Sequence, residues 1–236
     1  DKILIQGGRR LEGEVAVSGS KNAALPLLIS SLLTPEKCLY QRIPDLMDIQ
    51  AEPQHVLDAY GPDVNNPAKF ARQALLARRL VERGVRFVQL TMPGQPWDTL
   101  ANNAADTRKC CDQTDQPVAA LLTDLKRNGL LDTTLIFWAG EFGRTPAAQG
   151  KDGRDHHPYG FSVWLAGGGI RGGVCHGATD AFGHHALENR VSMADLHGTI
   201  LHLLGLDHAR LTFRHNSRDD RLTDVHEAKV LRELLA

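Results

Sequence analysis

Carboxylates and histidines that suit a metal site gather in three short stretches. PWDTLANN holds Asp98, GEFGRTP holds Glu141 and Arg144, and GRDHHP holds Asp155, His156 and His157. Imidazole and carboxylate groups together bind zinc or a harder divalent ion. We therefore predict a divalent metal cofactor, with zinc, calcium or manganese as candidates, and a ligand set of Asp98, Glu141, Asp155, His156 and His157.

Each stretch also has a plainer interpretation. Asp98 could cap a helix that begins near Asn102. Arg144 could bind a sulfate or phosphate oxygen, or it could simply neutralise Glu141. The histidines at 156–157 could be solvated in a polar loop. The metal interpretation gains weight because the three stretches are expected at the same edge of a sheet.

Histidine is unusually frequent, with 11 residues that concentrate in the last third of the chain. This composition is typical of a metal or phosphate site. His176 and the pair His184-His185 lie in Gly-rich segments and are weaker candidates. His197 and His202 fall in an expected helix, where packing or capping is the simpler role.

Apolar periodicity and turn residues predict the elements that position these stretches. Helices are expected at 67–83, 112–128 and 192–204, and strands at 85–92, 133–139 and 160–166. The run 133–139 is continuously apolar, as in a strand buried on both faces. The alternation of helix and strand indicates an α/β fold with a mostly parallel sheet, whose ligands bind beyond the carboxyl ends of the strands.

The front of the chain shows a different pattern. Strands are expected at 2–6 and 14–17, an apolar helix at 21–33 and a further strand at 38–43. Turn and loop residues follow. We place the junction near 49–52, which divides the chain into domains 1–49 and 52–236.

Composition narrows the class of partner. The chain has 236 residues, of which 42% are hydrophobic, and its 27 basic residues nearly balance 28 acidic ones. This balance gives no reason to expect nucleic acid or an anionic membrane as a partner. No apolar run is long enough to span a bilayer, and no signal peptide is visible, so the sequence leaves the compartment open.

Residues 52–236 resemble a large, mostly uncharacterised family of sulfatase-like proteins (DUF1501) in the alkaline-phosphatase superfamily. The matching stretches are EPQHVLDAYGPDVNNPAKFARQALLARRLVERGVRFVQL, PWDTLANN, GEFGRTP, GKDGRDHHPYGFSVWLAGGGIRGG and DLHGTILHLLGLDHARLTFRHNSRDDRLTDVH. The resemblance implies a partial alkaline-phosphatase-like three-layer core, preceded by a small ββα unit. It also implies bound divalent metals and cleavage of small-molecule sulfate or phosphate esters.

Two departures from that family weaken the expected activity. The family reads Trp-Asp-Thr-His where this chain has Leu100, and leucine cannot bind a metal. The half that carries the nucleophile in the superfamily has no counterpart before residue 52. We therefore expect a metal-binding half of an ester hydrolase with little or no activity, or a non-catalytic binding or structural module. We expect either self-association through an exposed sheet edge or partial covering of that surface by the N-terminal unit.

The front of the chain resembles another family. KILIQGGRRLEGEVAVSGSKNAALPLLISSLL is similar to the N-terminus of UDP-N-acetylglucosamine enolpyruvyl transferase. The resemblance implies that Lys21 is a phosphate-side cation and that Asn22 is a sugar-nucleotide contact, whereas a helix N-terminus is the plainer interpretation. On this view the chain is a chimera, and a transferase fragment is the remaining functional alternative.

Overall fold

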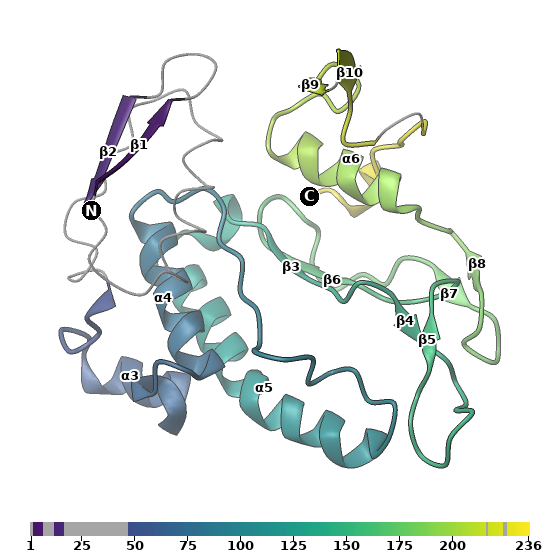
Figure 1. Cartoon of the computed structure of the whole chain (residues 1–236), viewed down its shortest axis with the longest axis horizontal. Coiled ribbons are helices and arrows are strands. Elements are labelled where there is room, and N and C mark those ends of the chain that lie inside the picture. Colours follow the sequence, from purple (N-terminus) through teal and green to yellow (C-terminus); the bar gives the residue numbers. More distant parts are fainter. Residues whose placement is uncertain (1, 7–11, 17–46, 216, 224–225) are drawn as a thin grey trace. The chain divides into compact units, whose positions relative to one another are not determined.

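The computed structural model describes residues 2–6, 12–16, 47–215, 217–223 and 226–236 (Figure 1). The chain divides into two compact units. The first comprises Asp1–Asp98 and Ala104–Leu130, and the second comprises Thr99–Asn103 and Leu131–Ala236. Lys21, Asn22 and the elements predicted at 21–33 and 38–43 lie outside the described residues.

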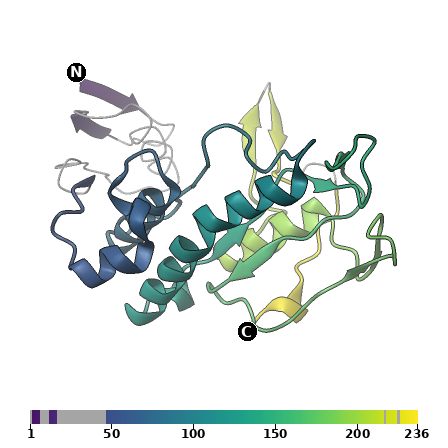
Figure 2. The same cartoon turned by 90° about the horizontal axis from the view of Figure 1, so that it is seen from below.

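The first unit is mainly helical. Strands β1 (Lys2–Gln6) and β2 (Glu12–Ala16) form an antiparallel pair. The helices are α3 (Gln54–Tyr60), α4 (Phe70–Glu82) and α5 (Asn103–Arg127), with the 3-10 turn η1 (Pro62–Asn65) between α3 and α4. The first residue of α5, Asn103, is assigned to the second unit. The structure confirms the helix predicted at 67–83. The helix predicted at 112–128 begins earlier, at Asn103, and continues through Pro117 (Figure 2).

An apolar stripe on α4 builds the core of the first unit. Ala71, Ala74 and Leu75 follow helical spacing and are buried, as are Leu121 and Leu125 on α5. Residues three and four apart share one face of a helix, so this spacing turns a single continuous face inward.

A buried cluster of charges accompanies that core. The Arg78 guanidinium lies 2.6 Å from Glu52 and 2.7 Å from Glu82, and Arg79 lies 2.7 Å from Glu52. The Arg78 and Arg79 residues are only 7% and 5% exposed. Burial alone lowers the pKa of Arg78, but the hydrogen bonds to Glu82 and Glu52 outweigh it and raise that pKa. The cluster ties the segment before α3 to α4.

Asp124 and Tyr60 extend this cluster toward α5. The Asp124 carboxylate lies 3.6 Å from Nε of Arg78 and is 7% exposed. Burial, and after it the Asp124 charge, raises the pKa of Tyr60, so the phenol stays protonated. Buried charges are tolerated only when they are paired, and here the pairs come from three segments.

The strand predicted at 85–92 is absent from the described structure, where these residues form neither helix nor ladder. A strand requires a neighbour that accepts and donates its backbone hydrogen bonds. No such neighbour is present for 85–92 among the described residues. The alternating composition of VRFVQLTM was therefore insufficient for a strand.

The second unit consists of short antiparallel pairs and one helix. The pairs are β3 (Ile136–Trp138) with β6 (Trp164–Ala166), β4 (Gly143–Arg144) with β5 (His156–His157), β7 (Ala178–Thr179) with β8 (Ala186–Glu188), and β9 (Phe213–His215) with β10 (Arg218–Asp220). The 3-10 turns are η2 (Leu131–Thr133) and η3 (Arg232–Leu234). Every pair named between described strands is antiparallel. The expected three-layer core with a mostly parallel sheet remains a prediction.

The strand predicted at 133–139 is shortened to β3 and is not buried on both faces. Phe137 is 42% exposed and Trp138 is 37% exposed. The strand predicted at 160–166 is likewise shortened to β6, beside β3 (Figure 1). The prediction of burial was wrong because both faces of β3 remain exposed, Phe137 on one face and Trp138 on the other. A continuous apolar run shows that a strand can be buried, whereas burial requires covering layers.

The helix predicted at 192–204 is confirmed as α6 (Met193–Leu203). Ser192 and Asp195 form a reciprocal capping box, in which each side chain accepts a hydrogen bond from the other's backbone N–H. Partial burial alone raises the pKa of Asp195, but hydrogen bonds donated by Lys229 and Ser192 outweigh it and lower that pKa. The buried Thr199 hydroxyl accepts from the Leu231 N–H at 3.0 Å, which fixes the C-terminal segment on α6. Across the described residues, no helix is long and apolar enough to cross a membrane.

Candidate functional site: a histidine cluster in the second unit

Two of the three predicted stretches form one antiparallel pair. In the β4–β5 pair, Gly143 lies opposite His157 and Arg144 lies opposite His156. The backbone N–H of Thr145 donates to the Asp155 carbonyl at 2.9 Å and continues the pairing. The structure thus brings the GEFGRTP and GRDHHP motifs together.

Gly143 is required by its close backbone surroundings. A Cβ atom at this position would meet the carbonyl oxygen of Gly160 and would lie 2.7 Å from Cβ of Phe161. A glycine with open space beside it could let the backbone approach a ligand closely. In the structure, the space beside Gly143 is taken by the chain that follows His157.

His157 is the buried centre of the site. It is 4% exposed, and its Nε2 contacts the backbone carbonyl of His184. A carbonyl oxygen only accepts hydrogen bonds, so Nε2 is the donor in this contact, and Nδ1 takes no part in it.

Three imidazole rings lie together around this position. The ring centre of His157 is 4.2 Å from that of His184 and 6.3 Å from that of His185, and the last two are 4.6 Å apart. The ring of Tyr159 lies 5.4 Å from His157 and 5.7 Å from His185. We name His157, His184, His185 and Tyr159 the histidine cluster.

Asp180 shapes the loop that presents His184 and His185. Its carboxylate accepts hydrogen bonds from the backbone N–H groups of Phe182 at 3.1 Å, His184 at 2.8 Å and His185 at 3.0 Å. The bond from His184, together with those from His185 and Phe182, lowers the pKa of Asp180. Asp180 is thus a positioning residue for the cluster.

The carboxylates predicted as ligands have other surroundings. The Asp155 carboxylate accepts from the Gln149 N–H at 2.8 Å and closes the loop between β4 and β5. The Glu141 side chain is 69% exposed and lies 3.9 Å from Arg144, as the ion-pair interpretation expected. The Arg144 guanidinium carbon lies 5.6 Å from the ring centre of Phe142.

The remaining predicted residues lie elsewhere. The ring of His156 lies 4.5 Å from that of Phe142, on the exposed side of β5. Asp98 belongs to the first unit, where it lines a pocket. Asp152 accepts from the Asn102 N–H at the start of α5, the place where a cap by Asp98 was considered. The metal-ligand roles of Asp98, Glu141, Asp155 and His156 remain predictions.

In the described part of the chain, no three His, Cys, Asp or Glu side chains are arranged to hold a metal ion. The histidine cluster brings together three imidazoles, a donor type that zinc accepts, but not in a ligating arrangement. Imidazoles that share a zinc ion through bonds of about 2.0–2.1 Å hold their ring centres roughly 5 Å apart. The three measured separations bracket that value. Side-chain rotations are the change that a shared ion requires.

Sequence reasoning underrated His184, His185, Asp180 and Tyr159. The available signal was a repeated pattern, because Asp155 precedes one His-His pair and Asp180 precedes the other in the sequence. What spacing alone could not show was that two pairs separated by a long Gly-rich segment meet in space.

Comparison with known proteins gives two kinds of match. The model of a family described as "Protein of unknown function (DUF1501)" matches residues 8–235. The UDP-N-acetylglucosamine 1-carboxyvinyltransferase of Desulfosudis oleivorans is 61% identical over 51 residues, which are 22% of this chain and 12% of that protein. The enzyme of the same name from Xanthobacter autotrophicus is 48% identical over 69 residues, which are 29% of this chain and 16% of that protein. No solved structure matches.

These matches correct the family assignment made from the sequence. The family match does not begin at residue 52 but at residue 8, and it crosses the junction at 49–52 that was taken to separate two families. Neither the family's description nor these relatives name a sulfatase or an alkaline phosphatase. The sulfatase-like assignment and the interpretation as a chimera are therefore wrong. The transferase likeness is limited to short segments, and the chain spans only about an eighth to a sixth of the length of those relatives.

Because the family model covers nearly the whole chain, the chain belongs to the DUF1501 family of proteins of unknown function.

Proposed function

We propose that the second unit binds a divalent metal ion through the imidazoles of the histidine cluster. The observation that carries this proposal is the grouping of the His184 and His185 rings beside the ring of the buried His157. His157 donates its Nε2 proton to the His184 carbonyl, which is the type of support that metal-binding histidines have on their second nitrogen. Nδ1 of His157 would then be the nitrogen available to bind the ion.

The activity we propose for this site is hydrolysis of a small phosphate or sulfate ester. A bound divalent ion supplies charge screening for the anionic group. Arg144 lies opposite His156, on the face of the β4–β5 pair away from His157, so its role in binding an anion is a separate prediction.

Metal content of the purified protein tests the binding step. The protein is incubated with zinc, manganese or calcium, desalted and subjected to elemental analysis. We expect one bound ion per chain, which is lost in the His157→Ala, His184→Ala double variant. His202→Ala is the matched control, because His202 is exposed on α6. A wild type without metal, or a double variant that retains it, overturns the proposal.

The predicted ligands and the hydrolysis step need separate variants. His156→Ala shows whether the predicted ligand set or the histidine cluster holds the ion, because only the former includes His156. Hydrolysis of p-nitrophenyl phosphate and p-nitrophenyl sulfate by metal-loaded protein tests the activity. We expect the His157→Ala, His184→Ala double variant to lose that rate together with the bound metal. Absence of turnover by the metal-loaded wild type would leave metal binding as the function.

A second candidate function is binding of a sugar nucleotide at Lys21 and Asn22. The identity of 61% over 51 residues to a UDP-N-acetylglucosamine 1-carboxyvinyltransferase favours it. Calorimetric titration with UDP-N-acetylglucosamine tests it directly. Binding that disappears in Lys21→Ala supports this function, whereas equal affinity of the two proteins, or no binding, excludes it.

A further inference from the structure

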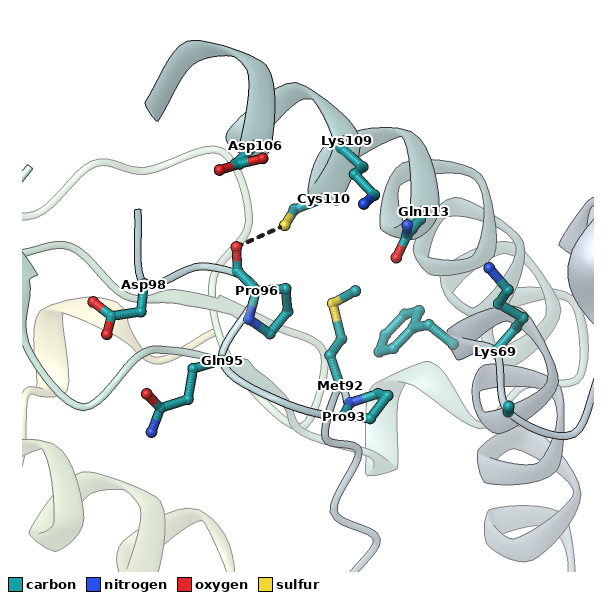
Figure 3. Close-up of a pocket in the computed structure, with 12 residues that line it drawn as sticks. Lys69, Met92, Pro93, Gln95, Pro96, Asp98, Asp106, Lys109, Cys110 and Gln113 are labelled. Carbon is teal, nitrogen blue, oxygen red and sulfur yellow. Dashed lines mark hydrogen bonds between the residues drawn. The ribbon is translucent and has the colours of Figure 1, made fainter. Parts of the chain in front are cut away.

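The first unit contains a pocket that is lined by both polar and apolar side chains. None of its lining residues belongs to the histidine cluster. Its volume is about 420 Å³, within the range of about 300–1,000 Å³ that is common for small-molecule sites. The walls come from α5, from the start of α4 and from the loop before Asp98. Figure 3 shows Lys109 and Gln113 reaching from α5 toward Met92 of that loop.

The loop is fastened to α5 by a buried thiol. Cys110 is 3% exposed and donates a hydrogen bond from its sulfur to the Pro96 carbonyl at 3.2 Å. Burial raises the pKa of Cys110, so the thiol keeps the proton that it donates. The loop that lines the pocket is therefore held against α5 by this hydrogen bond.

Charges of both signs line the pocket in different places. Lys69 and Lys109 lie toward one end, and Asp98 and Asp106 lie toward the other (Figure 3). Between them, Met92, Pro93 and Pro96 supply apolar surface. A lining of two cations and two anions suits neither a simple anion nor a simple cation.

Asp106 and Lys109 are an informative pair. They are three residues apart on α5, a spacing that permits an ion pair on a helix. Within the described part of the chain, neither side chain takes part in an ion pair, although both line the pocket. Lys69, by contrast, lies 3.8 Å from Asp63.

We propose that this pocket binds a small zwitterion of the dipeptide type, with its carboxylate at Lys109 and its ammonium group at Asp106. Apolar side chains of the ligand contact Met92 and the two prolines. The amide of Gln113, one turn beyond Lys109 on α5, lies at the carboxylate end of such a ligand and could add a hydrogen bond there. A ligand with separated charges joins the two groups on α5 that do not join each other.

Leucyl-leucine is the probe, used with the whole protein in calorimetric titration and ligand-observed NMR. The blocked controls are N-acetyl-leucyl-leucine and leucyl-leucine amide, each of which lacks one charge. We expect each blocked form to bind about tenfold more weakly than the free dipeptide, as the loss of one charge-assisted hydrogen bond implies. Equal binding of the three forms, or no saturable binding of the free dipeptide, overturns the proposal.

Variants assign each end of the ligand. Lys109→Met should weaken the free dipeptide about tenfold but leave the amide form unchanged, because both changes remove the same interaction. Asp106→Asn should weaken binding of the free dipeptide about tenfold but leave binding of the acetylated form unchanged. Lys109→Arg keeps the positive charge and should therefore bind the free dipeptide like the wild type. Lys126→Met, on the exposed face of α5, is the control. If Lys109→Met weakens all three forms equally, Lys109 has only a structural role and the proposal fails.

Discussion

The two units of the chain use ionisable residues in opposite ways. In the first unit, Arg78 and Arg79 are buried against carboxylates from separate segments, and every charge in the cluster has a structural neighbour. In the second unit, His184 and His185 are exposed around one buried histidine, and a hydrogen-bonded loop presents them. Ion pairs sealed from water hold a fold, whereas accessible imidazoles remain available to bind.

The apolar residues follow the same contrast. Helices α4 and α5 bury a continuous stripe, while β3 and β6 leave Phe137, Trp138 and Trp164 substantially exposed. Phe137 lies on one face of the pair, whereas the cross-strand partners Trp138 and Trp164 share the other and form an exposed apolar surface of the kind that can mark an interaction site. The self-association expected from the sequence remains a prediction for this surface.

The largest effect should come from breaking the buried charge cluster. Glu52→Gln removes the carboxylate shared by Arg78 and Arg79, and we expect a loss of about 3 kcal/mol of unfolding free energy, because a buried charge is left uncompensated. Asp219→Asn in the second unit is the matched change, since its pair with Arg214 is exposed; it should cost under about 1 kcal/mol. Urea unfolding measures both. Similar losses would show that the two units do not differ in this respect.

A smaller effect is expected from filling the space beside β4. Gly143→Ala places a methyl group against Gly160 and Phe161 and should destabilise the protein by about 1–3 kcal/mol. Since Gly143 lies opposite His157, the change should also weaken metal binding. Gly172→Ala, with no atom within 4 Å of its Cβ position, should change stability by less than about 0.5 kcal/mol. Normal metal content in Gly143→Ala would show that the packing beside β4 does not affect metal binding at the histidine cluster.

The smallest effect concerns the loop held by Asp180. Its folded-state pKa is lowered, so its stabilising contribution is complete above the unfolded value of about 3.9 and is lost as pH falls through the folded value. Amide chemical shifts of His184 and His185 should therefore change together at acid pH. Asp180→Asn should abolish that transition and weaken metal binding at neutral pH. A wild-type transition only near the histidine pKa would assign the change to imidazole protonation instead.

Helix α4 shows what local sequence determines. Its apolar spacing and the turn residues on either side predicted its position to within a few residues, because one face of a helix must become apolar before it can pack. The capping residue Ser192 likewise marked the start of α6. The pairing of 85–92 could not be predicted in the same way, since a strand depends on a distant partner.

The candidate site divides along the same line. The sequence by itself determined that carboxylates and histidines are concentrated in a few short motifs, and it indicated that Glu141 and Arg144 could pair. Only the tertiary structure decided that β4 lies beside β5 and that His157 meets His184 and His185. The physical reason is that residue type and local spacing are properties of neighbouring positions, whereas a site is made by backbone pairing and loop closure between segments far apart in the chain.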